Sequence, residues 1–533
     1  MLSALAFALS FPLSEDFVAG WPLAFVWPAL LGACVRSAAS WRTAAVAVGV
    51  PYFAAFLAHE WWMHEVTVLG MPVLVAYLAA WTVVLALVVR TLGGTRHAPR
   101  APFVLVLPVA LVAVEFLRGD LVCTGYAWFF AAHPLVEWPA VAQVASIGGG
   151  WMLSALVAVV AGGVLDACIA RGARRVWSPA AALACLGGAV AFGAERIAAH
   201  DAATTPPERA LLIVQTNLPM SNKLSWEPAA QVEDFVAFAR LTIEGAMAAR
   251  QAGESFEAAV WPETMVPGFG LERESIRALL EGRYFPGDRF EEGLRDLSSR
   301  IGTPLVVGSP AFLALRAEEQ RWAWDRQFNS AYLVDATGAR GRTDKIFLTP
   351  FGETMPIISN WDWLEQRLLD LGASGMTFDL DVAAAPSTLT LGGAAPLRMG
   401  VPICFEITKP WASRTIAFDG AARKADVLVN ISNDGWFSGS TAGRRQHLQV
   451  AQLRAAELST PVVRAANTGI SASIDATGRI NGSLGAAAEG TLVARFRPAA
   501  GTPLAAHVGD GFAFGMLLLA VLGCALAGRV KPA

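Results

Sequence analysis

The sequence predicts a multi-span α-helical membrane domain joined to an α/β domain. Of the 533 residues, 54% are hydrophobic and 16% are charged, which is far from the average of a soluble protein. The apolar residues concentrate in 1–197 and again in 511–528, whereas 198–510 carries most of the charge. Within 198–510, short apolar runs rich in β-branched residues alternate with helical stretches, as in α/β domains.

The apolar regions contain eight candidate membrane spans. They lie at about 2–13, 17–35, 43–58, 67–89, 101–117, 139–170, 177–197 and 511–528, judged against the roughly 20 apolar residues that a spanning helix needs. We therefore predict about seven transmembrane helices in 1–197, and one more in 511–533 followed by a short basic tail. A signal peptide is the alternative for the first 35 residues, but it requires a basic start, and 1–11 contains no Lys or Arg.

The charges of the connecting loops predict the orientation. Loops rich in arginine alternate with acidic or neutral connections, and basic loops favour the cytoplasmic side. The basic groups are Arg36 and Arg42; Arg90, Arg96 and Arg100; Arg171, Arg174 and Arg175; and Arg529 and Lys531. This alternation predicts a multi-pass protein of a bacterial cytoplasmic (inner) membrane with both termini in the cytoplasm, and it predicts that 198–510 faces the periplasm.

Charge and cysteine usage exclude several classes of function. The net charge of -3 arises without a long basic run, so the sequence predicts no nucleic-acid partner. Cys404 is the single cysteine of 198–510, which excludes an internal disulfide there, and no Cys/His cluster has zinc spacing. We predict no metal and no cofactor.

Three residues that can carry chemistry follow apolar runs of the α/β region. The predicted strands are 209–217, 258–262, 304–309, 330–335, 397–404 and 426–432, with helices in 230–252, 273–300 and 444–458 between them. Glu263 follows Trp-Pro after the second run, Lys345 follows Thr-Asp, and Cys404 ends the fifth run. Taken alone, each residue also has a common non-catalytic explanation: Glu263 as a solvated acid, Lys345 as an exposed lysine and Cys404 as a small buried hydrophobic residue.

Together, a Glu, a Lys and a Cys in this order resemble the nitrilase, or carbon-nitrogen hydrolase, superfamily across about 209–500, which implies an αββα sandwich. Further segments resemble the apolipoprotein N-acyltransferase family, and the resemblance covers nearly the whole chain. These segments are Asp344-Lys345 through Phe351-Gly352-Glu353, Asn433 to Phe437, Arg464 to Ile470, Glu115 to Gly119 and Thr124 to Trp128.

The resemblance implies a role for each member of the site. Glu263 would be the general base, Cys404 would carry an acyl thioester, and Lys345 with the backbone N–H of Phe405 would stabilise the oxyanion. Phe405 stands where the family commonly has tyrosine, so any role of a hydroxyl is lost. The supporting carboxylates would be Glu353 and Glu406, and the candidate substrate-binding residues are Trp226, Asn329, Trp436, Phe437 and Gly148. Large aromatic residues are also common in protein cores, so the aromatic members keep that alternative.

The implied reaction moves an acyl chain from a phospholipid to Cys404 and then to the α-amine of an N-terminal diacylglyceryl-cysteine of a lipoprotein. Its partners are thus the phospholipid donor, the lipoprotein acceptor and the bilayer. The stretch 353–370, with Trp361 and Trp363, either lies in the membrane interface or packs as an amphipathic helix. Two alternatives remain open: a membrane-tethered amidase or nitrilase that uses water as the second nucleophile, and a non-catalytic membrane scaffold or transporter with a decayed nitrilase domain.

Overall fold

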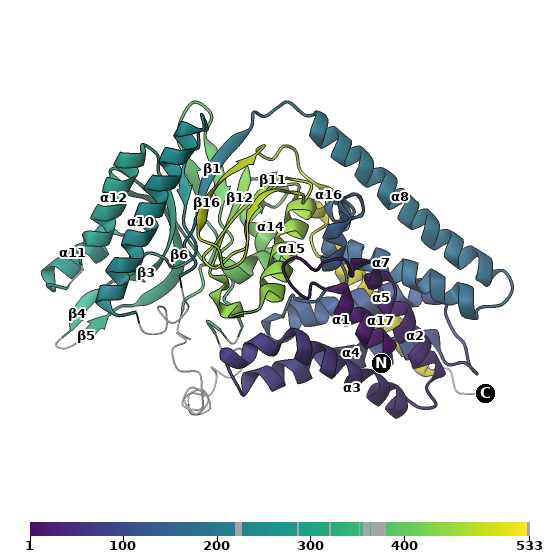
Figure 1. Cartoon of the computed structure of the whole chain (residues 1–533). Coiled ribbons are helices and arrows are strands. Elements are labelled where there is room, and N and C mark those ends of the chain that lie inside the picture. The colour runs from purple at the N-terminus through teal and green to yellow at the C-terminus, as the bar shows by residue number, and fades with distance from the viewer. Residues whose placement is uncertain are drawn as a thin grey trace. The chain divides into compact units, whose positions relative to one another are not determined.

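A computed structural model describes residues 1–218, 226–284, 287–318, 321–350, 352–354, 363 and 380–529 (Figure 1). The chain divides into two compact units. Unit 1 comprises Met1–Ala202, Gly439–Glu457 and Pro503–Ala533, and unit 2 comprises Ala203–Ser438 and Leu458–Thr502. Each unit is therefore built from separate stretches of the sequence.

Unit 1 is helical. Its described α-helices are α1 (Leu2–Ser10), α2 (Trp27–Ser37), α3 (Trp41–His59), α4 (Gly70–Gly93), α5 (Phe103–Phe116), α6 (Pro139–Ala142), α7 (Ala145–Ile169), α8 (Arg174–Ala202), most of α15 (Thr441–Leu458), α16 (Leu504–Val508) and α17 (Gly511–Arg529). Five of these are long and apolar enough to cross a membrane, namely α3, α4, α7, α8 and α17. The eight-span layout remains a prediction.

The other three predicted spans contain shorter helices. Helix α1 has 9 residues, α2 has 11 and α5 has 14. The chain is extended at Phe11, the residue before Pro12, and Pro28 lies in the first turn of α2, so proline sets both boundaries. Helix α5 continues into a π-helical turn, Leu117–Leu121, which extends its helical path.

A buried carboxylate joins three helices of unit 1. Asp166 of α7 is fully buried and accepts the backbone N–H groups of Phe103 and Val104 at 3.2 and 3.1 Å. The same carboxylate accepts the Ser178 hydroxyl at 2.9 Å and pairs with Arg174 at 2.6 Å. Asp166 therefore caps the N-terminus of α5, where unsatisfied N–H groups favour an anion, and ties α8 to the same point.

Helix α15 follows a sandwich strand in the sequence but belongs largely to the helical unit. Gln446 accepts the indole N–H of Trp128 at 2.7 Å, and Arg445 and Gln449 both donate to the carboxylate of Glu137, at 2.6 and 2.9 Å. Three polar side chains of α15 are thus bonded within unit 1. Composition alone predicts the helix at 444–458 but gives no sign of these partners.

Unit 2 contains two six-stranded sheets. In the first sheet the order is β16 (Gly490–Phe496), β1 (Arg209–Gln215), β2 (Ala259–Val260), β3 (Leu305–Leu313), β6 (Arg326–Asp335) and β7 (Gly338–Asp344). In the second it is β15 (Ile480–Leu484), β14 (Ser471–Ile474), β13 (Val462–Ala466), β12 (Val427–Ser432), β9 (Leu397–Gly400) and β8 (Thr388–Leu391). Strands β1, β2 and β3 run parallel, as do β9, β12 and β13, and antiparallel strands flank both sets. A strand is present at each of the six predicted positions. The prediction that Cys404 ends the fifth strand is wrong, because β9 ends at Gly400, and β2 is shorter than the predicted 258–262.

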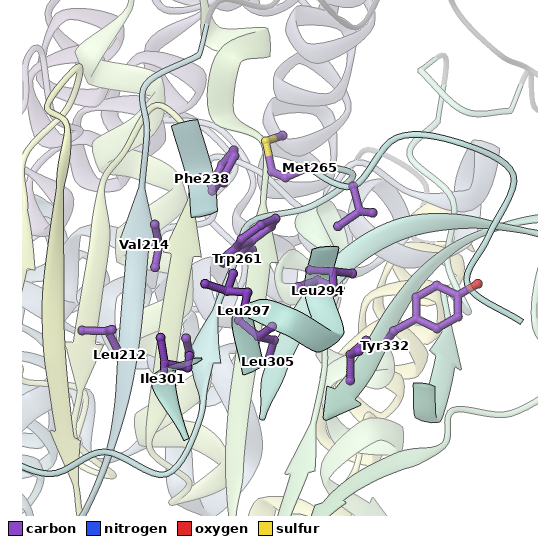
Figure 2. Packing of buried hydrophobic residues seen from close by; sticks show 14 of the residues in the cluster. Leu212, Val214, Phe238, Trp261, Met265, Leu294, Leu297, Ile301, Leu305 and Tyr332 are labelled. Carbon is purple, nitrogen blue, oxygen red and sulfur yellow. The ribbon is translucent and has the colours of Figure 1, made fainter. Parts of the chain in front are cut away.

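Helices cover the outer faces of the two sheets. One apolar cluster joins the inner faces of the two sheets. A second joins the first sheet to α10 (Pro228–Gln251) and α12 (Arg289–Ile301), with Phe238 and Leu294 over Trp261 (Figure 2). On the second sheet, Ile416 of α14 (Pro410–Ala417) lies against Gly400 of β9. The layers are helix, sheet, sheet, helix, and the expected αββα sandwich is confirmed.

Two helix predictions differ in detail from the structure. The stretch 273–300 contains two helices, α11 (Arg273–Glu281) and α12, because the chain leaves α11 at Gly282 and Gly287 has φ 59°. Most of 353–370, including Trp361, lies outside the described residues, and the described Trp363 is exposed.

Candidate active site

Glu263 stands just after β2, where the backbone of β3 approaches closely. A Cβ added at Gly308 of β3 would lie 2.4 Å from the backbone nitrogen of Thr264 and 2.7 Å from the Cα of Glu263. Thr264 has φ 53°, a conformation that is uncommon for residues other than glycine. Gly308 therefore makes room for the turn that presents the carboxylate.

Lys345 follows β7, and its fully buried ammonium lies between two carboxylates. Its Nζ is 2.7 Å from Oε2 of Glu353 and 3.6 Å from Oε1 of Glu263. Asn329 of β6 connects the same two acids, because its Nδ2 donates to Oε1 of Glu263 at 2.7 Å and to Oε1 of Glu353 at 2.9 Å. The backbone N–H of Thr349 adds a bond of 2.9 Å to Oε2 of Glu353.

The second oxygen of Glu263 is held by the other sheet. The backbone N–H of Asn433, directly after β12, donates to Oε2 of Glu263 at 3.0 Å. Asn467 fixes the Asn433 side chain by donating to its Oδ1 at 3.2 Å. The Glu263 carboxylate is thus held from both sheets, which restricts its rotation.

Cys404 begins a short 3₁₀ helix, Cys404–Thr408, after β9. It has φ 53° although it is not a glycine, and such a conformation costs about 1–3 kcal/mol, which the surrounding structure has to offset. The residue is partly exposed.

Glu406 ties the segment after Lys345 to the residue before Cys404. Its Oε1 accepts the backbone N–H groups of Ile346 at 2.6 Å and Phe347 at 3.0 Å, and its Oε2 accepts that of Ile403 at 2.7 Å. The Glu406 residue is buried. Burial raises the pKa of Glu406 to about 7, and the charge of Lys345 with the three N–H groups limits that rise.

The electrostatics of the site favour a neutral thiol and a charged lysine. Burial of the sulfur, followed by the charge of Glu263, raises the pKa of Cys404 to about 12, against the lowering effect of Lys345. Burial acts to lower the pKa of Lys345, but Glu353 and Glu263 hold it above its usual range. Burial likewise acts to raise the pKa of Glu353, and the adjacent Lys345 holds it below its usual value.

The comparisons with known proteins concern both parts of the chain. Residues 213–505 match the carbon-nitrogen hydrolase family, and residues 3–163 match the apolipoprotein N-acyltransferase N-terminal domain. A curated apolipoprotein N-acyltransferase of Rhizobium meliloti is 32% identical over 423 residues, covering 78% of this chain and 70% of that protein. The chain belongs to the apolipoprotein N-acyltransferase family.

Other relatives agree. The apolipoprotein N-acyltransferase of Bradyrhizobium diazoefficiens is 33% identical, covering 86% of this chain and 79% of its own length, and that of Geobacter metallireducens is 32% identical, covering 88% and 82%. Among solved structures, a nitrilase-superfamily amidase of Nesterenkonia aligns with 57% of this chain and 93% of its own, at 17% identity and a TM-score of 0.34. A carbon-nitrogen hydrolase of Helicobacter pylori aligns with 54% and 89%, at 15% identity and a TM-score of 0.35.

Three residues singled out by the apolipoprotein N-acyltransferase resemblance lie just after two strands of the second sheet: Phe405 after β9, and Trp436 and Phe437 after β12. The Phe405 ring is half-buried and stacks on Phe347 with ring centroids 6.4 Å apart. Trp436 is half-buried and Phe437 is buried, both on the 3₁₀ turn after β12. Their placement keeps both alternatives, pocket lining and core packing, open.

Two further candidates are placed elsewhere. Trp226 precedes α10, and its indole N–H donates to Asp234 of that helix at 2.9 Å. Gly148 belongs to unit 1 and forms, with Gly149, a non-helical break inside α7. Gly149 has φ 73°, and a Cβ there would lie 3.0 Å from the carboxylate of Glu457, so this break is built for close approach.

Sequence reasoning missed the groups that hold the site in place. Asn433, Asp434, Arg464 and Asn467 lie in segments that resemble the family, yet nothing in their spacing assigns a role. In the structure, buried Arg464 pairs with buried Asp434, and Asn467 anchors Asn433. The described residues contain no group of three or more His, Cys, Asp or Glu side chains suited to a metal ion.

Proposed function

We propose that this chain is an apolipoprotein N-acyltransferase that transfers an acyl chain from a phospholipid to the N-terminal amine of a diacylglyceryl-lipoprotein. The observation that carries the proposal is the cluster of buried Glu263 and Lys345 with partly exposed Cys404, in a chain whose helical part matches the family's N-terminal domain. The match to that domain distinguishes the chain from a water-soluble hydrolase of the same fold.

In the first half-reaction, Glu263 takes the proton of the Cys404 thiol while the sulfur attacks the ester carbonyl of the phospholipid. The resulting oxyanion is stabilised by Lys345 and the backbone N–H of Phe405. The C–O bond then breaks, the lysophospholipid oxygen recovers the proton from Glu263, and the acyl chain remains on sulfur. A thiol whose pKa is about 12 is neutral at physiological pH, which is why this step needs a base.

In the second half-reaction, the neutral amine of the lipoprotein attacks the thioester carbonyl. Glu263 accepts one proton from the amine, a new C–N bond forms and the C–S bond breaks. The Cys404 sulfur leaves with the proton returned by Glu263, so the enzyme regains its initial state. No step requires a metal or a cofactor.

We further propose that 1–197 and 511–533 span the cytoplasmic membrane and that 198–510 lies in the periplasm. The alternation of basic and neutral loops and the five long apolar helices support this arrangement. A periplasm-active reporter should function when fused after Thr205 and fail when fused after Arg174. The reverse pattern would overturn the orientation.

Mass spectrometry tests the reaction directly. Purified protein incubated with phospholipid should gain one acyl adduct on Cys404 that hydroxylamine removes, and Cys404→Ala should gain none. Addition of a diacylglyceryl-cysteine peptide with a free α-amine should discharge the adduct as an amide. Release of free fatty acid alone would indicate a hydrolase, and absence of any adduct would indicate a non-catalytic scaffold.

A further inference from the structure

The orientation of the Asn329 side chain is determined by its neighbours. Its nitrogen lies 2.7 Å from Glu263 and 2.9 Å from Glu353, and ionised carboxylates accept hydrogen bonds but cannot donate them. The charge of Lys345 keeps Glu353 ionised, because it holds the pKa of Glu353 low against the effect of burial. The amide nitrogen must therefore face the two acids, and the amide oxygen must face elsewhere.

That oxygen is buried and unpaired. Asn329 is only 7% exposed, and its Oδ1 has no hydrogen-bond partner among the described residues. A buried carbonyl oxygen without a donor is unfavourable, so such a group in a native structure requires an explanation, and a role in catalysis is one of them. Because Oδ1 and Nδ2 share one carbon atom, the unpaired acceptor lies beside Glu263.

The chemistry of the proposed reaction limits what can occupy this acceptor. The lysophospholipid that leaves in the first half-reaction has a single O–H group, and its proton comes from Glu263 itself. Neither the phospholipid ester nor the acyl thioester has an N–H or O–H group at its reacting centre. The attacking amine does, because a neutral primary amine has two N–H groups. In the second half-reaction one of these protons passes to Glu263, and the other remains on the nitrogen of the new amide.

We infer that Asn329 Oδ1 accepts a hydrogen bond from the second N–H of the acceptor's primary amine while the amine attacks the thioester on Cys404. The inference rests on the proposed function and assigns Asn329 to the aminolysis step. Asn329 would thereby orient the amine by one N–H while Glu263 receives the other. Because the amine nitrogen is tetrahedral, these two hydrogen bonds direct its lone pair toward the carbonyl carbon of the thioester.

A purely positioning role for Asn329 makes a different prediction. If Asn329 only holds Glu263 and Glu353, its loss weakens the base in both half-reactions and affects every nucleophile alike. If Oδ1 binds the amine, its loss matters most for an acceptor that offers two N–H groups. An N-methylated acceptor offers one, and Glu263 uses it.

The test is a cycle of two proteins and two acceptors. Enzyme loaded with phospholipid is mixed with a diacylglyceryl-cysteine peptide bearing either a primary or an N-methyl α-amine, and amide formation is followed in a single turnover. The wild type should prefer the primary amine, and Asn329→Ala should reduce that preference by about three- to tenfold, the range of one net hydrogen bond. An unchanged preference would overturn the inference, as would a wild type that uses both amines equally.

Asn467→Ala is the matched control, because it disturbs Glu263 from the opposite side through Asn433. It should slow both acceptors by the same factor and keep the wild-type preference. If Asn329→Ala does not fold, Asn329→Ser places its single oxygen at the position of the asparagine Cγ, leaves no acceptor at the position of Oδ1 and should show the same loss of preference. Failure of the proposed function is distinct, since the wild type would then form no amide with either acceptor.

Discussion

Replacing Glu406 with glutamine tests whether its carboxylate holds Lys345 and Cys404 at a fixed position relative to each other. Its two oxygens accept three backbone N–H groups, two after Lys345 and one before Cys404. Glutamine can keep the bonds on one side, but its NH₂ group must then oppose an N–H on the other. A bond to a charged acceptor contributes about 1.5–3 kcal/mol, so acyl-enzyme formation should slow by about 10- to 150-fold.

The pH dependence of Glu406→Gln provides a second measurement. Burial raises the pKa of Glu406 to about 7, and only the ionised form accepts all three N–H groups. Loading of wild type in single-turnover assays should therefore rise as the pH passes about 7, and the variant should lack this rise. The same raised pKa stabilises the fold below about pH 4.5, a contribution that is lost as the pH rises toward 7.

Glu281→Gln is the control for the Glu406 experiment, since Glu281 is exposed at the end of α11. It should load at the wild-type rate with the wild-type pH profile. Glu406→Gln behaving in the same way as this control would refute the view that Glu406 couples the two segments.

Other substitutions separate charge, stability and structure. Glu263→Gln removes a negative charge that, after burial, contributes to the raised pKa of Cys404, so the thiol should react faster with iodoacetamide at pH 9. Loading of the acyl chain should nevertheless fall about 10²–10⁴-fold, because the general base is lost. Slower alkylation would contradict this electrostatic account. Lys345→Met leaves the buried carboxylate of Glu263 and the partly buried carboxylate of Glu353 without their cation, and it should lower stability by about 3–5 kcal/mol. Adding Glu353→Gln should restore part of the stability but no loading, as thermal melts and acyl-enzyme yields would show. Asp166→Ala should lower the melting temperature in detergent, because two backbone N–H groups of α5 lose their acceptor and each loss costs about 1–3 kcal/mol. An unchanged melting temperature would show that this N-terminal cap is dispensable.

The short apolar runs with clear ends allowed prediction of an α/β domain, and the resemblance to the nitrilase superfamily implied the sandwich. Glu263, Lys345 and Cys404 were identifiable because each lies in a segment that resembles the family. Their contacts were not, because the bonds from Asn329 and the Asn433 backbone join strands that are far apart in the chain. The Asn329 bond depends on the order of strands within the first sheet and the Asn433 bond on how the two sheets stack, and no local pattern encodes either.

The helical part shows a different limit of sequence reasoning. Apolar windows located the segments, but local proline chemistry shortened α1 and α2 below the length of a span. The helix at 444–458 was predicted, whereas its bonds to Trp128 and Glu137 were not. A helix without a strong apolar face gives no indication of which polar partners it will find.

The mixed membership of α15 has a consequence for the order in which the protein matures. Most of α15 and all of α17 belong to unit 1, so that unit stays incomplete until α17 has been synthesised. At ordinary synthesis rates the delay after Ala202 is on the order of tens of seconds. During this interval α15 has not yet been synthesised, so Trp128 and Glu137 lack their bonding partners on that helix. Neither unit can be expressed as one continuous fragment, so a gene split at Ala202 should yield two products that need each other to become stable.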